Sequence, residues 1–152
     1  MQAFRISAAA AAFAASVALV GLPACSSVAG VTGAQASART LDGGWQVQAV
    51  DGKPLDGARK PELTFDTGKN TVTGFDGCNR ISGGYSLEGG RLTAPRLVST
   101  RMACLGDEPR RASAAIAELF ANGAEVVETT VAGERVLTIR NAKAEIRLRK
   151  TQ

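Results

Sequence analysis

The sequence contains no histidine among its 152 residues. Histidine is the commonest general base, the usual activator of a nucleophilic serine or cysteine, and the commonest zinc ligand. Its absence excludes a Ser-His-Asp hydrolase and argues against a zinc site. No glycine-rich segment has the spacing of a phosphate-binding loop either. The sequence therefore predicts a protein that is not an enzyme and that needs no cofactor.

Aromatic residues are also scarce, with one tryptophan, one tyrosine and five phenylalanines. The net charge is only +4, from 18 basic and 14 acidic side chains. The basic residues are scattered and are not interleaved with aromatic ones, which argues against nucleic-acid binding. Beyond the N-terminal stretch, no apolar run is long enough to span a bilayer.

The N-terminus carries the one long apolar stretch. Arg5 is the only charged residue before a run rich in Ala, Val and Leu from Ile6 to Gly21. This pattern is typical of a signal peptide, and it is short and Ala-rich for a spanning helix. The run ends in Leu22-Pro23-Ala24-Cys25, which resembles the lipobox of bacterial lipoproteins. The alternative is an ordinary secretory peptide cut near Ala24 or Ala29.

The lipobox resemblance implies that residues 1–24 are a signal peptide and that Cys25 carries the lipid, with palmitate among its acyl chains. Ser26 stands where an aspartate would retain a lipoprotein in the inner membrane. We therefore expect a cell-envelope protein, lipid-anchored in the outer membrane and facing the periplasm. Small residues dominate 25–40 without apolar periodicity, which predicts a flexible tether.

Two further cysteines, Cys78 and Cys104, remain after Cys25. In an exported protein an even pair favours a disulfide. In the chain-entropy model, closing the loop 78–104 contributes about 3–4 kcal/mol of stability. The alternative is two buried free thiols. A metal site is not expected, because two sulfurs without histidine do not make a set of four ligands.

Alternating apolar and polar residues predict about eight short strands, at residues 43–50, 63–65, 71–75, 81–87, 91–93, 125–131, 135–140 and 144–150. One helix is predicted over 108–122, capped by Asp107 and ended by Asn122-Gly123. Its apolar face consists of Ala112, Ala115, Ile116, Leu119 and Phe120.

These elements predict a mainly β, α+β domain over residues 41–152. We expect a small antiparallel β-barrel, or a strongly curved sheet, covered by the one helix. Trp45 shares a phase with Val47 in the first strand. Both should be buried in one core with Leu119 and Phe120 of the helix.

Two segments carry the densest motifs. The first, residues 74–85, combines four glycines with Asn79 and Arg80, and the second, residues 99–104, contains Arg101. Glycines and asparagine are typical of a bend with unusual backbone angles. The functional interpretation is an interaction loop formed by Asn79, Arg80 and Arg101. The structural interpretation, which we favour, is a cross-linked bend.

Catalytic roles for nearby side chains find little support. Ser99 has no histidine to activate it. Acid catalysis by Asp76 with Asp107 or Glu108 would need carboxyl groups about 5–10 Å apart. Nothing in the sequence brings these groups so close.

The two motifs together resemble the META domain family, which includes HslJ-like proteins. The residues that carry the resemblance are Gly77-Cys78-Asn79-Arg80, Ser82-Gly83, Tyr85, Leu97 and Ser99-Thr100-Arg101-Met102-Ala103-Cys104. Trp45 matches the tryptophan usual near the start of that domain, and residues 108–122 match its helix. The resemblance spans about residues 38–150 and implies a small lipocalin-like β-barrel with one helix.

The resemblance also implies a function. Members of the family have no established enzymatic chemistry and are associated with envelope stress, drug tolerance, secretion and motility. We therefore expect a non-enzymatic, monomeric envelope lipoprotein that acts as a structural or interaction module for another envelope protein. The alternative is a carrier that holds a small apolar ligand in its barrel, which would require an internal cavity.

Overall fold

The computed structural model describes residues 34–151. The predicted signal peptide, Cys25 and most of the predicted tether lie outside these residues. In chain order the elements are β1 (Ala34–Gln35), α1 (Ala38–Leu41), β2 (Gly43–Val50), β3 (Lys53–Pro54), β4 (Glu62–Asp66), β5 (Thr71–Phe75), β6 (Arg80–Gly84), β7 (Ser86–Glu88), β8 (Arg91–Thr93), β9 (Val98–Ser99), α2 (Asp107–Asn122), β10 (Ala124–Val131), β11 (Glu134–Arg140) and β12 (Glu145–Lys150).

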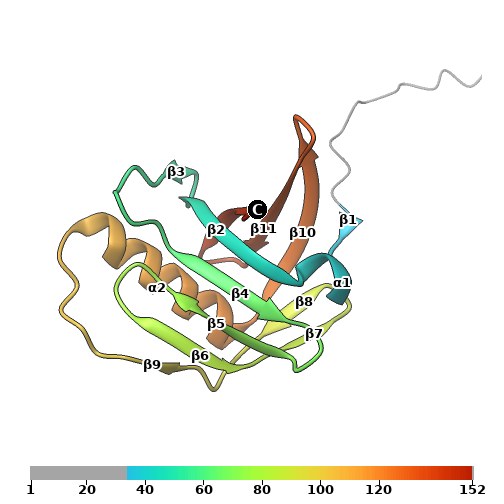
Figure 1. Ribbon diagram of the computed structural model, residues 1–152, viewed down its shortest axis with the longest axis horizontal. Helices are drawn as coiled ribbons and strands as arrows, with labels where there is room; N and C mark the ends of the chain where they lie inside the picture. The colour runs from blue at the N-terminus through green and yellow to red at the C-terminus, as the bar shows by residue number, and fades with distance from the viewer. Residues whose placement is uncertain (1–33, 152) are drawn as a thin grey trace, which may run out of the picture. The chain divides into compact units, whose positions relative to one another are not determined.

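All the strands belong to one antiparallel sheet. Its order is β7-β8-β10-β11-β12-β2-β4-β5-β6-β9, with β1 added on β10 and β3 on β2. The sheet curls as a half-barrel around α2 (Figure 1). This confirms the predicted mainly β fold with one main helix. Among residues 34–151, no helix combines the length and the hydropathy that crossing a membrane requires.

The core lies between the curled sheet and α2. Trp45 and Val47 of β2 are fully buried, as are Leu119 and Phe120 of α2, which confirms the predicted core. The Phe120 ring packs edge-on against that of Phe65 in β4, with 6.3 Å between the ring centroids. The whole predicted apolar face of the helix is buried: Ala112, Ala115, Ile116, Leu119 and Phe120.

Two predicted boundaries are wrong. The strand expected over 81–87 is divided at Tyr85, where the chain leaves β6 and enters β7. The helix begins at Asp107, and its N-cap is Gly106, with a φ of 96°. Asp107 therefore lies in the first turn, where its negative charge interacts favourably with the helix dipole without capping it.

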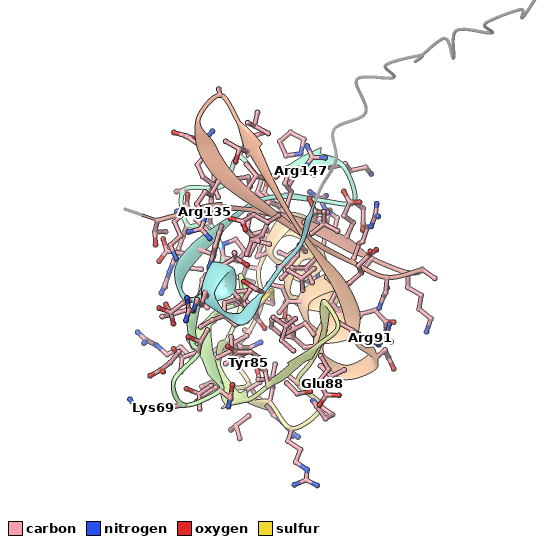
Figure 2. The ribbon with its side chains drawn as sticks, turned by 90° about the vertical axis from the view of Figure 1, so that its right-hand side faces the viewer. Lys69, Tyr85, Glu88, Arg91, Arg135 and Arg147 are labelled. Carbon is pink, nitrogen blue, oxygen red and sulfur yellow. A yellow bond between two sulfur atoms is a disulfide. The ribbon has the colours of Figure 1, made fainter. Side chains whose placement is uncertain are left out.

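The tether prediction does not hold for residues 34–40, so the folded part begins before residue 41. β1 pairs with β10, and the amide of Ala36 donates to the carbonyl of Val126 at 3.0 Å. Arg135 (Figure 2) donates to the carbonyl of Thr40 at 2.7 Å. These bonds use backbone groups, so they require no apolar periodicity in the sequence.

Tyr85 places a polar atom in the core. It lies between β6 and β7 (Figure 2), is 7% exposed, and packs edge-on against Phe65 at 5.4 Å between centroids. Within the described part of the chain its hydroxyl has no hydrogen-bond partner. Burial raises the pKa of Tyr85, and the negative charges of Asp42 and Asp66 raise it further.

We predict that Tyr85→Phe leaves the free energy of unfolding near neutral pH unchanged or higher, because it removes an unpaired buried hydroxyl. Above about pH 10 the unfolded chain releases the Tyr85 proton more readily than the folded protein does. The stability linked to the raised pKa is therefore present below about pH 10 and is lost as the pH rises through the folded-state pKa. The variant should therefore lose less stability than wild type in alkaline solution. Urea unfolding across this pH range measures both effects. A loss of about 1–3 kcal/mol near neutral pH would contradict the prediction.

Candidate functional site

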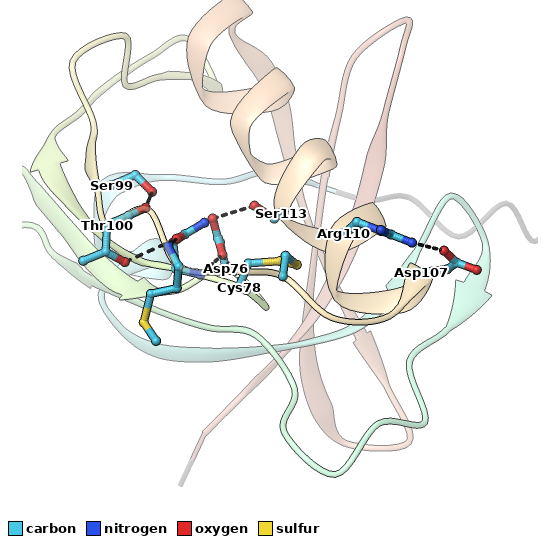
Figure 3. Close-up of a disulfide and its surroundings, with 10 residues drawn as sticks. Asp76, Cys78, Ser99, Thr100, Asp107, Arg110 and Ser113 are labelled. Carbon is cyan, nitrogen blue, oxygen red and sulfur yellow. Dashed lines mark hydrogen bonds and ion pairs between the residues drawn. A yellow bond between two sulfur atoms is a disulfide. The ribbon is translucent and has the colours of Figure 1, made fainter.

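The fold brings the two sequence motifs side by side. Cys78 lies in the bend between β5 and β6, and Cys104 lies between β9 and α2. Their sulfurs form a disulfide, with the Cα atoms 5.1 Å apart, within the range for such bonds (Figure 3). This confirms the predicted pairing.

Asp76 anchors the first motif from inside. Its side chain is 4% exposed, and one carboxylate oxygen accepts the amide hydrogens of Cys78 and Asn79, at 2.8 and 2.6 Å. The other oxygen accepts the hydroxyl of Ser113 in α2 at 2.8 Å (Figure 3). Such bonds satisfy a buried carboxylate and attach the bend to the helix. This role of Asp76 was not predicted, although an aspartate directly before Gly-Cys-Asn is typical of such a turn.

Hydrogen bonds join the two motifs in addition to the disulfide. The side-chain oxygen of Asn79 accepts the amide hydrogen of Met102 at 2.9 Å. The amide of Thr100 donates to the carbonyl of Arg80 at 3.0 Å, and the amide of Arg80 donates to the Thr100 hydroxyl at 3.0 Å. Asn79 therefore holds the segments together, which is a structural role for one member of the predicted interaction loop.

The other two members of that loop are exposed. Arg80 and Arg101 make no side-chain hydrogen bond or ion pair with any residue in the range 34–151. Close to Arg101 in the chain lie Val98, Met102 and Leu105, which are 73%, 66% and 86% exposed. We call these five residues the motif surface. Its apolar members were not predicted, because exposure depends on where the disulfide holds the segment.

Each acidic residue near the motifs has a structural partner. Asp107 pairs with Arg110 in the first turn of α2 (Figure 3). Glu108 accepts the backbone amide of Gly57 at 2.8 Å. Asp76 is occupied by the bonds described above. Within the described residues, no group of histidine, cysteine or acidic side chains is arranged to hold a metal ion.

We predict that Asp76→Ala lowers the free energy of unfolding by about 1–3 kcal/mol, because it leaves two buried amides and the Ser113 hydroxyl without their acceptor. Denaturant unfolding measures the change. Asp107→Ala removes an aspartate whose side chain is 94% exposed, so it should cost no more than about 1 kcal/mol. Equal losses in both variants would contradict the anchoring role of Asp76.

Comparison with known proteins agrees with this geometry. The chain is 35% identical over 81 residues to the heat shock protein HslJ of Escherichia coli (strain K12), covering 53% of this chain and 56% of that protein. It thus spans little more than half the length of this curated relative.

Solved structures extend the match across most of the fold. An NMR structure of a protein from Burkholderia xenovorans has a TM-score of 0.65 and 25% identity, covering 87% of this chain and 99% of that one. A second NMR structure has a TM-score of 0.62 and 29% identity, covering 75% and 94%. The family described as META domain matches residues 38–152, a range that contains both motifs and the disulfide. The chain therefore belongs to the META domain family.

Proposed function

We propose that this protein is a non-enzymatic interaction module of the bacterial cell envelope, lipid-anchored at Cys25, and that it binds another envelope protein through the motif surface. The observation that carries the proposal is the contrast within the motifs. Cys78, Asn79 and Cys104 are committed to holding the segments together. Arg80 and Arg101 project from the same segments without a side-chain hydrogen bond or ion pair among the described residues.

The composition of the motif surface suits protein binding. Arginine and methionine are enriched at protein interfaces relative to the rest of the surface. Three of the four large exposed hydrophobic residues in the described range belong to it: Val98, Met102 and Leu105. A backbone fixed by a disulfide loses little conformational entropy on binding, which favours affinity. A role in envelope stress or drug tolerance would act through such a partner.

The packing of the interior supports this module over a ligand carrier. A carrier needs space inside the curled sheet, and small barrels are otherwise filled by their own side chains. Large side chains from β2, β4 and α2 are each at most 1% exposed at the centre: Trp45, Leu63, Phe65, Leu119 and Phe120. An apolar ligand in that position would have to displace them.

Anchoring is tested by Cys25→Ser. The wild-type protein should sediment with membranes and carry acyl chains, because a multiply acylated cysteine exceeds the two-signal requirement for stable membrane residence. The variant should appear as an uncleaved or soluble form. Membrane fractionation with mass spectrometry of the N-terminal peptide makes the comparison. Wild-type protein that is soluble and unlipidated would refute the lipid anchor.

Interaction is tested by photo-crosslinking in intact cells. A photoreactive residue replaces Met102 in one strain and Lys53 in another, both exposed positions. Met102 follows β9 and Lys53 lies in β3, and these two strands lie on different parts of the fold (Figure 1). A discrete adduct of a second envelope protein is expected from position 102 only. An adduct with the mass of two copies of this chain would contradict the expected monomer, and identical products from both positions would contradict the motif surface.

A further inference from the structure

β9 is an edge strand with an open side. Among the strands of residues 34–151 it pairs only with β6, in the register Ile81↔Ser99 and Ser82↔Val98. The Thr100 amide donates to the Arg80 carbonyl at 3.0 Å, which makes that pair a hydrogen-bonded one. Hydrogen-bonded and non-hydrogen-bonded pairs alternate in antiparallel sheets, so the N–H and C=O of Ser99 point away from β6. No backbone group within the described residues bonds them, so they can bond another strand.

The edge formed by β9 is short, and its own two residues include no charged residue and no proline. Proteins usually shield such edges by keeping the strand very short, or with charged side chains, proline, bulges or a covering segment. β9 consists only of Val98 and Ser99, and Val98 is 73% exposed. At the other end of the sheet, β7 carries Glu88. The short length of β9 is therefore the one shield within the strand, and the outward-pointing groups of Ser99 can still accept an added strand.

A groove lies between this edge and α2. It encloses a cavity of about 250 Å³ whose lining includes the buried Ile81, Ile116 and Phe120, with Leu97, Ser99 and Ala117 nearer the surface. Small side chains at Ser99 and Ala117 leave it open to solvent. The cavity is below the roughly 300–1,000 Å³ typical of small-molecule sites. Its size and apolar floor suit a single large apolar side chain of a peptide.

The surroundings of the groove are basic. Arg96 precedes β9 in the chain, Arg101 follows it, and Arg80 begins the neighbouring strand β6. All three are exposed, and none has a side-chain hydrogen bond or ion pair within residues 34–151. Asp76 contributes to the lining of the cavity, but it is buried and its carboxylate already accepts three hydrogen bonds. Charge complementarity therefore calls for an acidic partner.

We propose that the β9–α2 groove binds an extended acidic segment of a partner protein, which adds as a strand to β9 and places one large apolar side chain in the cavity. Peptide addition to a sheet edge is a general recognition mode, in which backbone bonds supply affinity and a pocket for alternate side chains supplies specificity. This inference rests on the proposed function and names the chemistry of its partner.

Selection from phage-displayed random peptides tests the groove on the purified full chain with its disulfide intact. Ala117→Leu fills the cavity from α2, and Ala114→Leu makes the same change at an exposed position that does not line it. Selected peptides should be acidic and contain a large apolar residue. Ala117→Leu should weaken their binding at least about tenfold, or 1.4 kcal/mol. The groove would be overturned if wild type selected no peptides beyond those selected by Ala117→Leu. It would also be overturned if both variants lost peptide affinity equally.

Amide hydrogen exchange tests strand addition with the tightest selected peptide. Exchange at the free Ser99 amide should slow about tenfold or more on binding, because the peptide carbonyl accepts its hydrogen. Ser99→Pro removes this donor without removing a hydrogen bond to β6, and it should weaken binding of the peptide. Binding with unchanged Ser99 exchange would overturn strand addition. If the peptide experiments fail while position 102 still crosslinks a partner, the proposed function stands and this inference alone fails.

Discussion

Replacing Phe120 by alanine is expected to lower the free energy of unfolding by about 3–5 kcal/mol, the range for removing a fully buried phenylalanine. Phe120 is 1% exposed, and its ring contacts the core at the point where α2 meets β4, 6.3 Å from the Phe65 centroid. The loss combines the transfer of the ring to water with the cavity left behind. Denaturant unfolding of the purified domain measures it.

Leu105→Ala is the matched control, because Leu105 is 86% exposed. Surface substitutions of this kind change stability by less than about 0.5 kcal/mol. Similar losses in the two variants, or a loss below about 0.5 kcal/mol for Phe120→Ala, would contradict the core described above.

Removing the disulfide is the second large effect. The double variant Cys78→Ala, Cys104→Ala should lose about 3–4 kcal/mol, because the bond joins residues separated by 26 positions and restricts the unfolded chain. For a domain of this size that corresponds to a fall of about 10–20 °C in melting temperature. Differential scanning calorimetry measures it.

Reduction of the wild-type disulfide should lower the melting temperature by a similar amount. The hydrogen bonds of Asp76 and Asn79 remain in both cases, so the bend should keep its local structure at low temperature. A loss below about 1 kcal/mol would mean that these hydrogen bonds alone fix the loop. Two free thiols in protein isolated from the envelope would refute the bond in the cell.

Periodicity explains how far the fold could be predicted. The spacing of Ala112, Ile116 and Leu119 predicts one apolar face of a helix, and that face is buried in the structure. The alternation around Trp45 and Val47 reports β2 in the same way. The two motifs indicated the family, and the parity of the cysteines indicated the disulfide.

Features that depend on distant backbone groups could not be predicted. β1 forms because its backbone pairs with that of β10. Such pairing requires no apolar periodicity in the sequence of residues 34–40. Asp76 reaches Ser113 across 37 positions, and only the fold brings them together. The groove beside β9 likewise exists because the fold brings Ser99 of β9 and Ala117 of α2 to the lining of one cavity.

Partner binding through the motif surface is decided by the crosslinking yield from position 102 in charge-reversed proteins. Arg80→Glu with Arg101→Glu reverses two exposed charges of the motif surface. Arg39→Glu with Lys53→Glu reverses two other exposed charges that likewise have no side-chain hydrogen bond or ion pair within residues 34–151. We expect the adduct to be lost in the first protein and kept in the second, with both proteins equally abundant in the cell. An adduct that persists after the reversal of Arg80 and Arg101 would contradict partner binding through the motif surface.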